Sequence, residues 1–187
     1  MSTVATATKL LTAEEFYELP DPLDGSKQEL VRGEVVTMPP PTFEHGEVQV
    51  NVAGHIWVFL KSNKIGRVVT GSGTVTDRKP DTVRGPDVSY YSKERVPLDV
   101  RIVKYADVPP DLCVEIISPS NTRNQMRAKI KEYFFSGVRM VWVVEPEDRS
   151  VTILLAPDEG RTIYENGTLD GGEVLPGFSC KVSDLFA

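Results

Sequence analysis

The sequence feature that most constrains the fold is an apolar run at 111–117, followed by a helical pattern at 121–136 and a second apolar run at 139–145. Gly137 stands between the second and third segments, where a glycine commonly ends a helix. The apolar residues of the helical pattern share one face: Met126, Ile130, Tyr133 and Phe134. Strand, helix and strand in this order predict a parallel βαβ unit with a right-handed crossover.

The N-terminal third of the chain shows signals for a helix and a hairpin. Thr12 and Glu15 have the spacing of a capping box, so a short helix is expected after Thr12. Residues 28–32 and 34–38 are expected to pair as strands around Gly33.

The middle of the chain contains one long element and several short ones. Residues 45–64 alternate like a strand at three valines but keep helical spacing throughout, so a helix is predicted, with Gly66 following its end. Further strands are expected at 67–71, 73–76, 86–91 and 150–156, with a surface excursion at 92–110 and a hairpin turn at 146–149.

This order of elements predicts an α/β (α+β) fold in which helices flank a mixed β-sheet. With 187 residues, of which 40% are hydrophobic, the chain is expected to form a single domain over residues 1–187. Residues 1–11 lack the regions of a signal peptide, and no apolar run is long enough for a membrane span, so we expect a soluble cytoplasmic protein with no membrane partner. Cys113 and Cys180 have no metal-binding spacing, so a zinc site is not expected.

Charge excludes one class of function. The net charge of −6 argues against a protein that coats nucleic acid through bulk basicity, but not against a nuclease with acids gathered at a metal site. The segment 121–131 contains four bases and no acid, which indicates either a solvated helix face or a local contact to phosphates. These bases are Arg123, Arg127, Lys129 and Lys131.

Two acids stand in apolar strands. Asp87 begins one strand, and Glu115 lies in the middle of another, on the same side as Cys113. A charged Glu115 would be costly to bury without a partner, so either each acid pairs with a base or the two together bind a hard cation such as Mg²⁺. Lys129 follows Glu115 on the next helix, at the edge of the apolar face, where it either extends into solvent or reaches back over the strand.

At this point the sequence resembles a known family. The motifs E29-L-V-x-G-E, H45, P86-D-V, E115-I-I-S-P-S, K129-x-x-x-Y, G137-V, W142-x-V and L175-P-G-F are similar to those of the Uma-type family of restriction endonucleases. This family belongs to the PD-(D/E)XK nuclease superfamily. The resemblance covers about residues 11–186, and it implies a restriction-endonuclease-like fold for that core.

The resemblance also implies a metal-dependent endonuclease that hydrolyses phosphodiester bonds, with DNA as the expected substrate and Mg²⁺ or Mn²⁺ as cofactor. Asp87 would be the first acid and Glu115 the second, and the backbone carbonyl of Ile116 would add a metal ligand. Glu29 would be a further acid beside the metal, although a solvent-facing hairpin position is its alternative.

The catalytic lysine is where the chain departs from the superfamily pattern. Ile117 stands where the superfamily often has a lysine, so the role passes to Lys129, which would orient the attacking water or stabilise the developing charge. Family members tend to have an acid four residues before this lysine, and here that position is Gln125. His45, Arg123 and Arg127 would contact nucleic acid, and cutting both strands implies a homodimer.

Two alternatives stay open. The first is a nucleic-acid-binding or regulatory protein that has the fold without the chemistry, which the missing lysine at Ile117 favours. The second is a hydrolase of another class that uses Glu29 and Glu115 as an acid/base pair.

Overall fold

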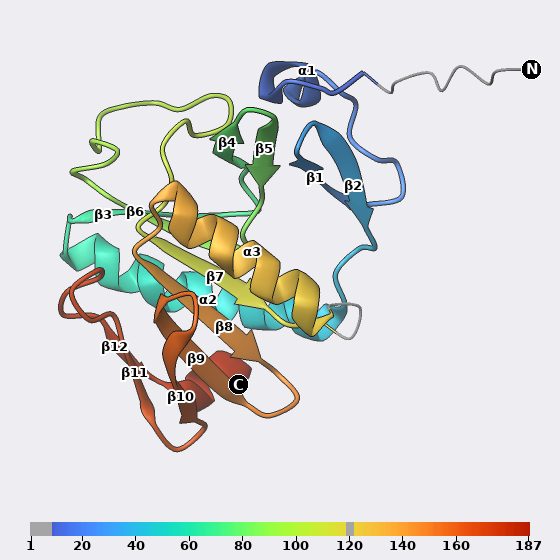
Figure 1. The fold of residues 1–187 in the computed structure, drawn as a ribbon. Helices are drawn as coiled ribbons and strands as arrows, with labels where there is room; N and C mark the ends of the chain where they lie inside the picture. Colours follow the sequence, from blue (N-terminus) through green and yellow to red (C-terminus); the bar gives the residue numbers. More distant parts are fainter. Residues whose placement is uncertain (1–8, 119–121) are drawn as a thin grey trace, which may run out of the picture.

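The protein, seen in a computed structural model that describes residues 9–118 and 122–187, is built around a six-stranded sheet with helices on both faces (Figure 1). The helices are α1 (Ala13–Tyr17), α2 (Phe43–Ser62), α3 (Arg123–Ser136) and the 3₁₀ helix η1 (Val182–Phe186). The strands are β1 (Lys27–Val31), β2 (Glu34–Met38), β3 (Gly66–Thr70), β4 (Thr74–Arg78), β5 (Asp81–Arg84), β6 (Val88–Ser92), β7 (Leu112–Ile116), β8 (Met140–Glu145), β9 (Ser150–Ala156), β10 (Glu159–Tyr164), β11 (Thr168–Asp170) and β12 (Ser179–Lys181).

The six-stranded sheet has the strand order β10-β9-β8-β7-β6-β3. β7 and β8 are parallel and are connected by α3, whereas the other neighbours in this sheet are antiparallel. The predicted βαβ unit and the mixed sheet flanked by helices are therefore confirmed. A four-stranded sheet, β2-β1-β5-β4, and the small β11-β12 pair complete the topology.

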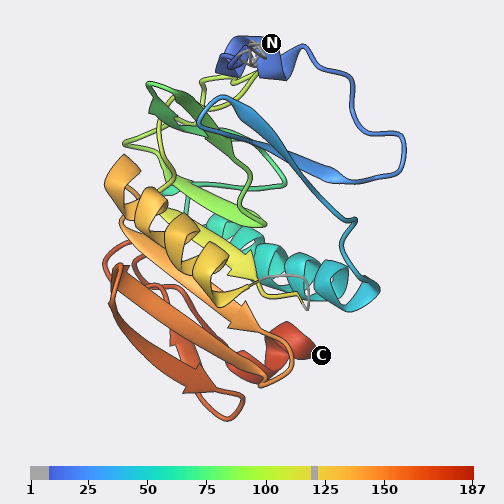
Figure 2. The ribbon, with the colours of Figure 1, turned by 45° about the vertical axis from the view of Figure 1, so that its right-hand side comes forward.

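Side-chain alternation along β7 divides the core into two layers. Leu112, Val114 and Ile116 pack with the apolar face of α2, whereas Cys113 packs with Ile130 of α3. The two helices consequently cover opposite faces of the sheet (Figure 2). This arrangement sends the side chain of Glu115 to the α3 side, as the sequence predicts.

Local signals account for most element boundaries. Thr12 and Glu15 form the expected capping box of α1, and Gly137 ends α3 in the left-handed conformation at φ 101°. The expectation that Gly66 follows the end of α2 as its cap is wrong, because Asn63 takes the C-cap position and Gly66 already begins β3. Strand β5 was not anticipated from the sequence.

Some sequence-based expectations cannot be compared with the structure. Pro119 and Ser120 of the family motif, and Asn121 at the expected start of α3, lie outside the described residues. In the described part of the chain, no helix combines the length and the apolar character needed to cross a bilayer.

Adjacent positions on α2 provide a test of this packing. Ile56 is fully buried and Trp57 is 53% exposed. We expect Ile56→Ala to lower the free energy of unfolding by about 2–5 kcal/mol, because it leaves a cavity in the central core. Trp57→Ala should change it by about 0.5 kcal/mol or less, as is usual for surface positions. Urea unfolding followed by circular dichroism measures both, and equal losses would contradict the described orientation of α2.

Candidate active site

Asp87 lies directly before β6, and both of its carboxylate oxygens have partners. Oδ2 accepts a hydrogen bond of 2.8 Å from the backbone N–H of Ile116, which ties Asp87 to the end of β7. Oδ1 lies 3.2 Å from Nζ of Lys27 and 3.4 Å from Nε2 of His45. Gln49 donates to the backbone carbonyl of Asp87 at 2.7 Å, so α2 holds this residue through two side chains.

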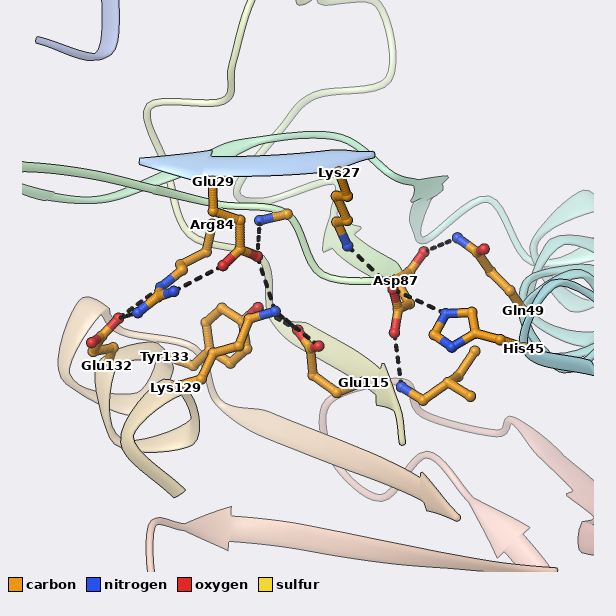
Figure 3. A network of polar contacts seen from close by, with 12 residues as sticks. Lys27, Glu29, His45, Gln49, Arg84, Asp87, Glu115, Lys129, Glu132 and Tyr133 are labelled. Carbon is orange, nitrogen blue, oxygen red and sulfur yellow. Dashed lines mark hydrogen bonds and ion pairs between the residues drawn. The ribbon is translucent and has the colours of Figure 1, made fainter. Parts of the chain in front are cut away.

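Glu115 is buried between β7 and α3. Its Oε1 accepts a hydrogen bond of 2.5 Å from the hydroxyl of Tyr133, and Nζ of Lys129 lies 2.9 Å from the carboxylate. The hydrogen bond of Asp87 is to the residue next to Glu115. Both acids therefore lie at the same end of β7. Glu115 belongs to β7 itself, and Asp87 reaches it from the residue before β6 (Figure 3).

Glu29 enters the site from the four-stranded sheet above β7 (Figure 3). It is only 2% exposed, so the alternative of a solvent-facing hairpin residue is wrong. Arg84 pairs with it at 2.8 Å, and the backbone N–H of Gly85 donates to it at 3.0 Å. Arg84 also pairs with Glu132 of α3 and so links the four-stranded sheet to that helix.

Lys129 reaches back from α3, as the sequence allows, and joins two of the acids. Its Nζ lies 3.0 Å from Glu29 and 2.9 Å from Glu115, and its side chain is only 12% exposed. Gln125, one turn earlier, instead forms the capping box of α3 with Thr122. Lys129 is therefore paired with Glu29 of the four-stranded sheet, and not with an acid at position 125 of its own helix.

Burial and neighbouring charges move the acids of the site in different directions. Burial acts to raise the pKa of Glu29, but the positive charges of Lys129 and Arg84 outweigh it and lower that pKa to about 2. Burial is likewise outweighed at Asp87, where the hydrogen bond from His45 and the charge of Lys27 hold the pKa well below its usual range.

Glu115 behaves differently from the other two acids. Burial raises its pKa, Lys129 opposes the rise, and the nearby charge of Asp87 adds to it. Burial also acts to lower the pKa of Lys129, but the charges of Glu115 and Glu29 outweigh it and raise that pKa. Glu115 is therefore the one of these three acids whose pKa lies above its ordinary value.

The donor set fits an open site for a hard cation. Within residues 9–118 and 122–187, no three His, Cys, Asp or Glu side chains form a group able to hold a metal ion. Mg²⁺ rarely needs such a group, because it commonly binds one or two carboxylates, several waters and substrate phosphates. Asp87 and Glu115, with the backbone carbonyl of Ile116, offer that kind of oxygen set. Acidic side chains outnumber basic ones in this cluster by one. The acids are Glu29, Asp87, Glu115 and Glu132, and the bases are Lys27, Arg84 and Lys129.

The structure gathers some of the predicted site residues and not others. Glu29, Asp87, Glu115, Lys129 and His45 belong to one polar network. Of the two predicted phosphate-binding arginines, Arg127 is exposed and pairs with Asp158 at 2.7 Å, outside that network. Arg123 is exposed in the first turn of α3.

Sequence reasoning missed five members of the network: Lys27, Gln49, Arg84, Glu132 and the hydroxyl of Tyr133. Lys27 could have been found, because it stands two residues before Glu29 and strand alternation puts both on one face. Tyr133 was assigned to the apolar face of α3, which is correct for its ring but does not reveal its hydrogen bond.

Comparison with known proteins agrees with this architecture. The model of the Uma2 family, described as "Putative restriction endonuclease", matches residues 13–183. The chain therefore belongs to the Uma2 family, and this membership supports a nuclease function. No curated protein sequence matches the chain.

One solved structure is similar over almost the whole chain. It is titled as a putative nuclease belonging to DUF820 from Anabaena variabilis, with a TM-score of 0.79 and 22% sequence identity. The match covers 94% of this chain and 97% of that one. At this identity the likeness establishes the fold, which is that of the mixed sheet flanked by helices.

The lowered pKa of Glu29 makes a prediction about stability and pH. The carboxyl has a pKa of about 2 in the folded protein against an ordinary 4.5, so its contribution is complete above pH 4.5 and is lost as the pH falls toward 2. We expect Glu29→Gln to lower the free energy of unfolding by roughly 3 kcal/mol at pH 7, and the difference from wild type to shrink between pH 4.5 and 2.

Urea unfolding at several pH values measures this difference. Glu14→Gln is the control, because Glu14 also pairs with an arginine but its side chain is 62% exposed, and it should have little effect. A deficit of Glu29→Gln that stays constant from pH 7 to pH 2 would show that the charge of Glu29 does not stabilise the fold.

Proposed function

We propose that the protein is a metal-dependent endonuclease that hydrolyses phosphodiester bonds of DNA, with Mg²⁺ or Mn²⁺ as cofactor. The observation that carries the proposal is the convergence at one end of β7, where Asp87 bonds to the residue next to Glu115 and Lys129 contacts Glu115. Family membership supports the same class of reaction.

In this proposal Asp87, Glu115 and the carbonyl of Ile116 hold the cation. When bound, the cation supplies Lewis acidity toward a water molecule and toward the phosphate oxygens. Lys129 uses two of its three N–H donors on Glu29 and Glu115, and it orients the attacking water with the third. The attacking water gives up a proton to solvent as its oxygen bonds to phosphorus, one P–O ester bond breaks, and the leaving oxygen takes up a proton from solvent.

His45 supports a contact to the substrate. Its Nδ1 is buried and has no hydrogen-bond partner among the residues that the structure describes, so with Nε2 donating to Asp87 it can accept a hydrogen bond from a water or a substrate hydroxyl at the site. We extend the proposal to Arg123 and Arg127 as contacts to more distant phosphates. Cleavage of both strands would use a homodimer of single-domain chains, acting in the cytoplasm.

A substitution of the first acid tests this proposal. We expect Asp87→Asn to reduce cleavage of a supercoiled plasmid by roughly 10³-fold or more, because about 4 kcal/mol of transition-state stabilisation is lost with the cation. Binding of Mn²⁺ measured by calorimetry should be lost too, while circular dichroism stays native, since the Asn oxygen still accepts from Ile116. Asp158→Asn, at an exposed ion pair, should leave cleavage and Mn²⁺ binding unchanged.

A binding protein without chemistry is the second candidate. Ile117, whose N–H bonds to Val144 within the sheet, occupies the position of the superfamily lysine and favours this candidate. Wild-type protein that binds a DNA duplex but neither binds Mn²⁺ nor cleaves would establish it. The remaining alternative, Glu29 and Glu115 as an acid/base pair, has less support, because the ammonium of Lys129 lies between the two carboxylates, 3.0 Å from Glu29 and 2.9 Å from Glu115.

A further inference from the structure

We propose that Lys27 is a second lysine of the reaction centre, which occupies the cation-binding oxygen of Asp87 in the free protein and contacts the scissile phosphate in the loaded one. This inference rests on the proposed nuclease function and deepens it, because it assigns the substrate contact to a residue outside the resemblance that suggested the site. Four observations support it.

The first observation is the difference between the two lysines. The ammonium of Lys129 lies between two carboxylates, and its side chain is 12% exposed. Among the described residues, the ammonium of Lys27 makes one ion pair, with Asp87 at 3.2 Å, and its side chain is 30% exposed. Lys27 is therefore the more accessible lysine and has two N–H donors left for a substrate, whereas Lys129 has one, which the proposed mechanism uses on the attacking water.

The second observation concerns the oxygen that Lys27 occupies. Oδ2 of Asp87 is held by the backbone of Ile116, so Oδ1 is the oxygen that a cation can reach. Lys27 and His45 both lie at Oδ1. His45 stands on the twenty-residue helix α2, which packs against the core, whereas the long side chain of Lys27 can swing. A cation at Oδ1 thus displaces Lys27 first, because like charges repel.

The third observation is a glycine that makes room for this side chain. A Cβ atom at Gly85 would lie 3.2 Å from Cε of Lys27 and 3.8 Å from its Nζ. Lys27 therefore reaches Asp87 by passing over the bare backbone of Gly85. Its position depends on the absence of a side chain there, which provides a way to move the ammonium without removing it.

The fourth observation is the space beside Lys27. Lys27 and Gly85 line a cleft of about 490 Å³ between the start of β1, the loop before β4 and the helix α1. Lys129 does not line this cleft. A lysine displaced from Asp87 consequently stays at the edge of an open space next to the acids, where a phosphate of the substrate carries the complementary charge.

Removal of the Lys27 ammonium should have opposite effects on the two measured quantities: tighter cation binding and slower cleavage. We expect Lys27→Met to bind Mn²⁺ about 3- to 10-fold more tightly in calorimetry, because the competing ammonium is gone. The same variant should cleave a plasmid about 10²-fold more slowly at saturating Mn²⁺, because one donor to the transition state is missing. Lys27→Arg should keep more of the cleavage than Lys27→Met. Lys104→Met, at an exposed pair with Glu18, is the control and should change neither quantity.

The variant Gly85→Ala tests the same idea with Lys27 present. The new methyl group should shift the end of the Lys27 side chain by a few tenths of an ångström, because a Cβ at Gly85 lies 3.2 Å from Cε, so Mn²⁺ binding should tighten by less than in Lys27→Met and cleavage should slow. Gly85 keeps its backbone N–H for Glu29 in this variant, and thermal unfolding checks that the fold is retained.

The outcomes separate the two proposals. Wild-type protein that neither binds Mn²⁺ nor cleaves would overturn the nuclease function itself. If the wild-type protein cleaves DNA but Lys27→Met binds Mn²⁺ no more tightly than wild type, Lys27 does not compete for Asp87. That result would overturn this inference and leave the nuclease function standing. Tighter Mn²⁺ binding with undiminished cleavage would overturn the contact to the phosphate.

Discussion

The interaction on which the site depends is the buried ammonium of Lys129 between Glu29 and Glu115. It connects α3, the four-stranded sheet and β7 through two ion pairs, of 3.0 Å to Glu29 and 2.9 Å to Glu115. Either carboxylate alone would be costly to bury, and so would the lysine. Together they form a network in which each charge has a partner, and removal of one member leaves the others uncompensated.

The same network divides the acids into two groups with different tasks. Glu29 is ionised well below neutral pH and is tied to Arg84, so it serves mainly to hold Lys129. Asp87 and Glu115 lie toward the end of β7, where the contacts of Asp87 to Lys27 and His45 are longer, at 3.2 and 3.4 Å, and Lys27 is partly exposed. In the proposed nuclease, the tightly paired part of the cluster around Glu29 lies behind the part that binds the cation and the substrate, as a preorganised hydrolytic site requires.

Local sequence signals predicted those features that depend on neighbouring residues. The capping box at Thr12, the glycine after α3 and the alternation along β7 each reflect contacts within a few residues, and all three are found in the structure. The parallel βαβ unit followed from the order of elements. Strand β5 was missed because its four residues have no periodicity of their own, and pairing with β1 and β4 stabilises it.

For the site, the sequence by itself determined which chemistry was available: an acid at a strand entrance, an acid inside a strand and a lysine on the following helix. It placed Lys129 at the edge of the apolar face of its helix, but left open whether this side chain extends into solvent or reaches back over the strand of Glu115. Only the tertiary structure decided that Glu29 is buried, that Lys27 and His45 share one oxygen of Asp87, and that Arg127 turns to Asp158 instead. These contacts join residues far apart in the chain, and the packing of separate sheets and helices sets their distances.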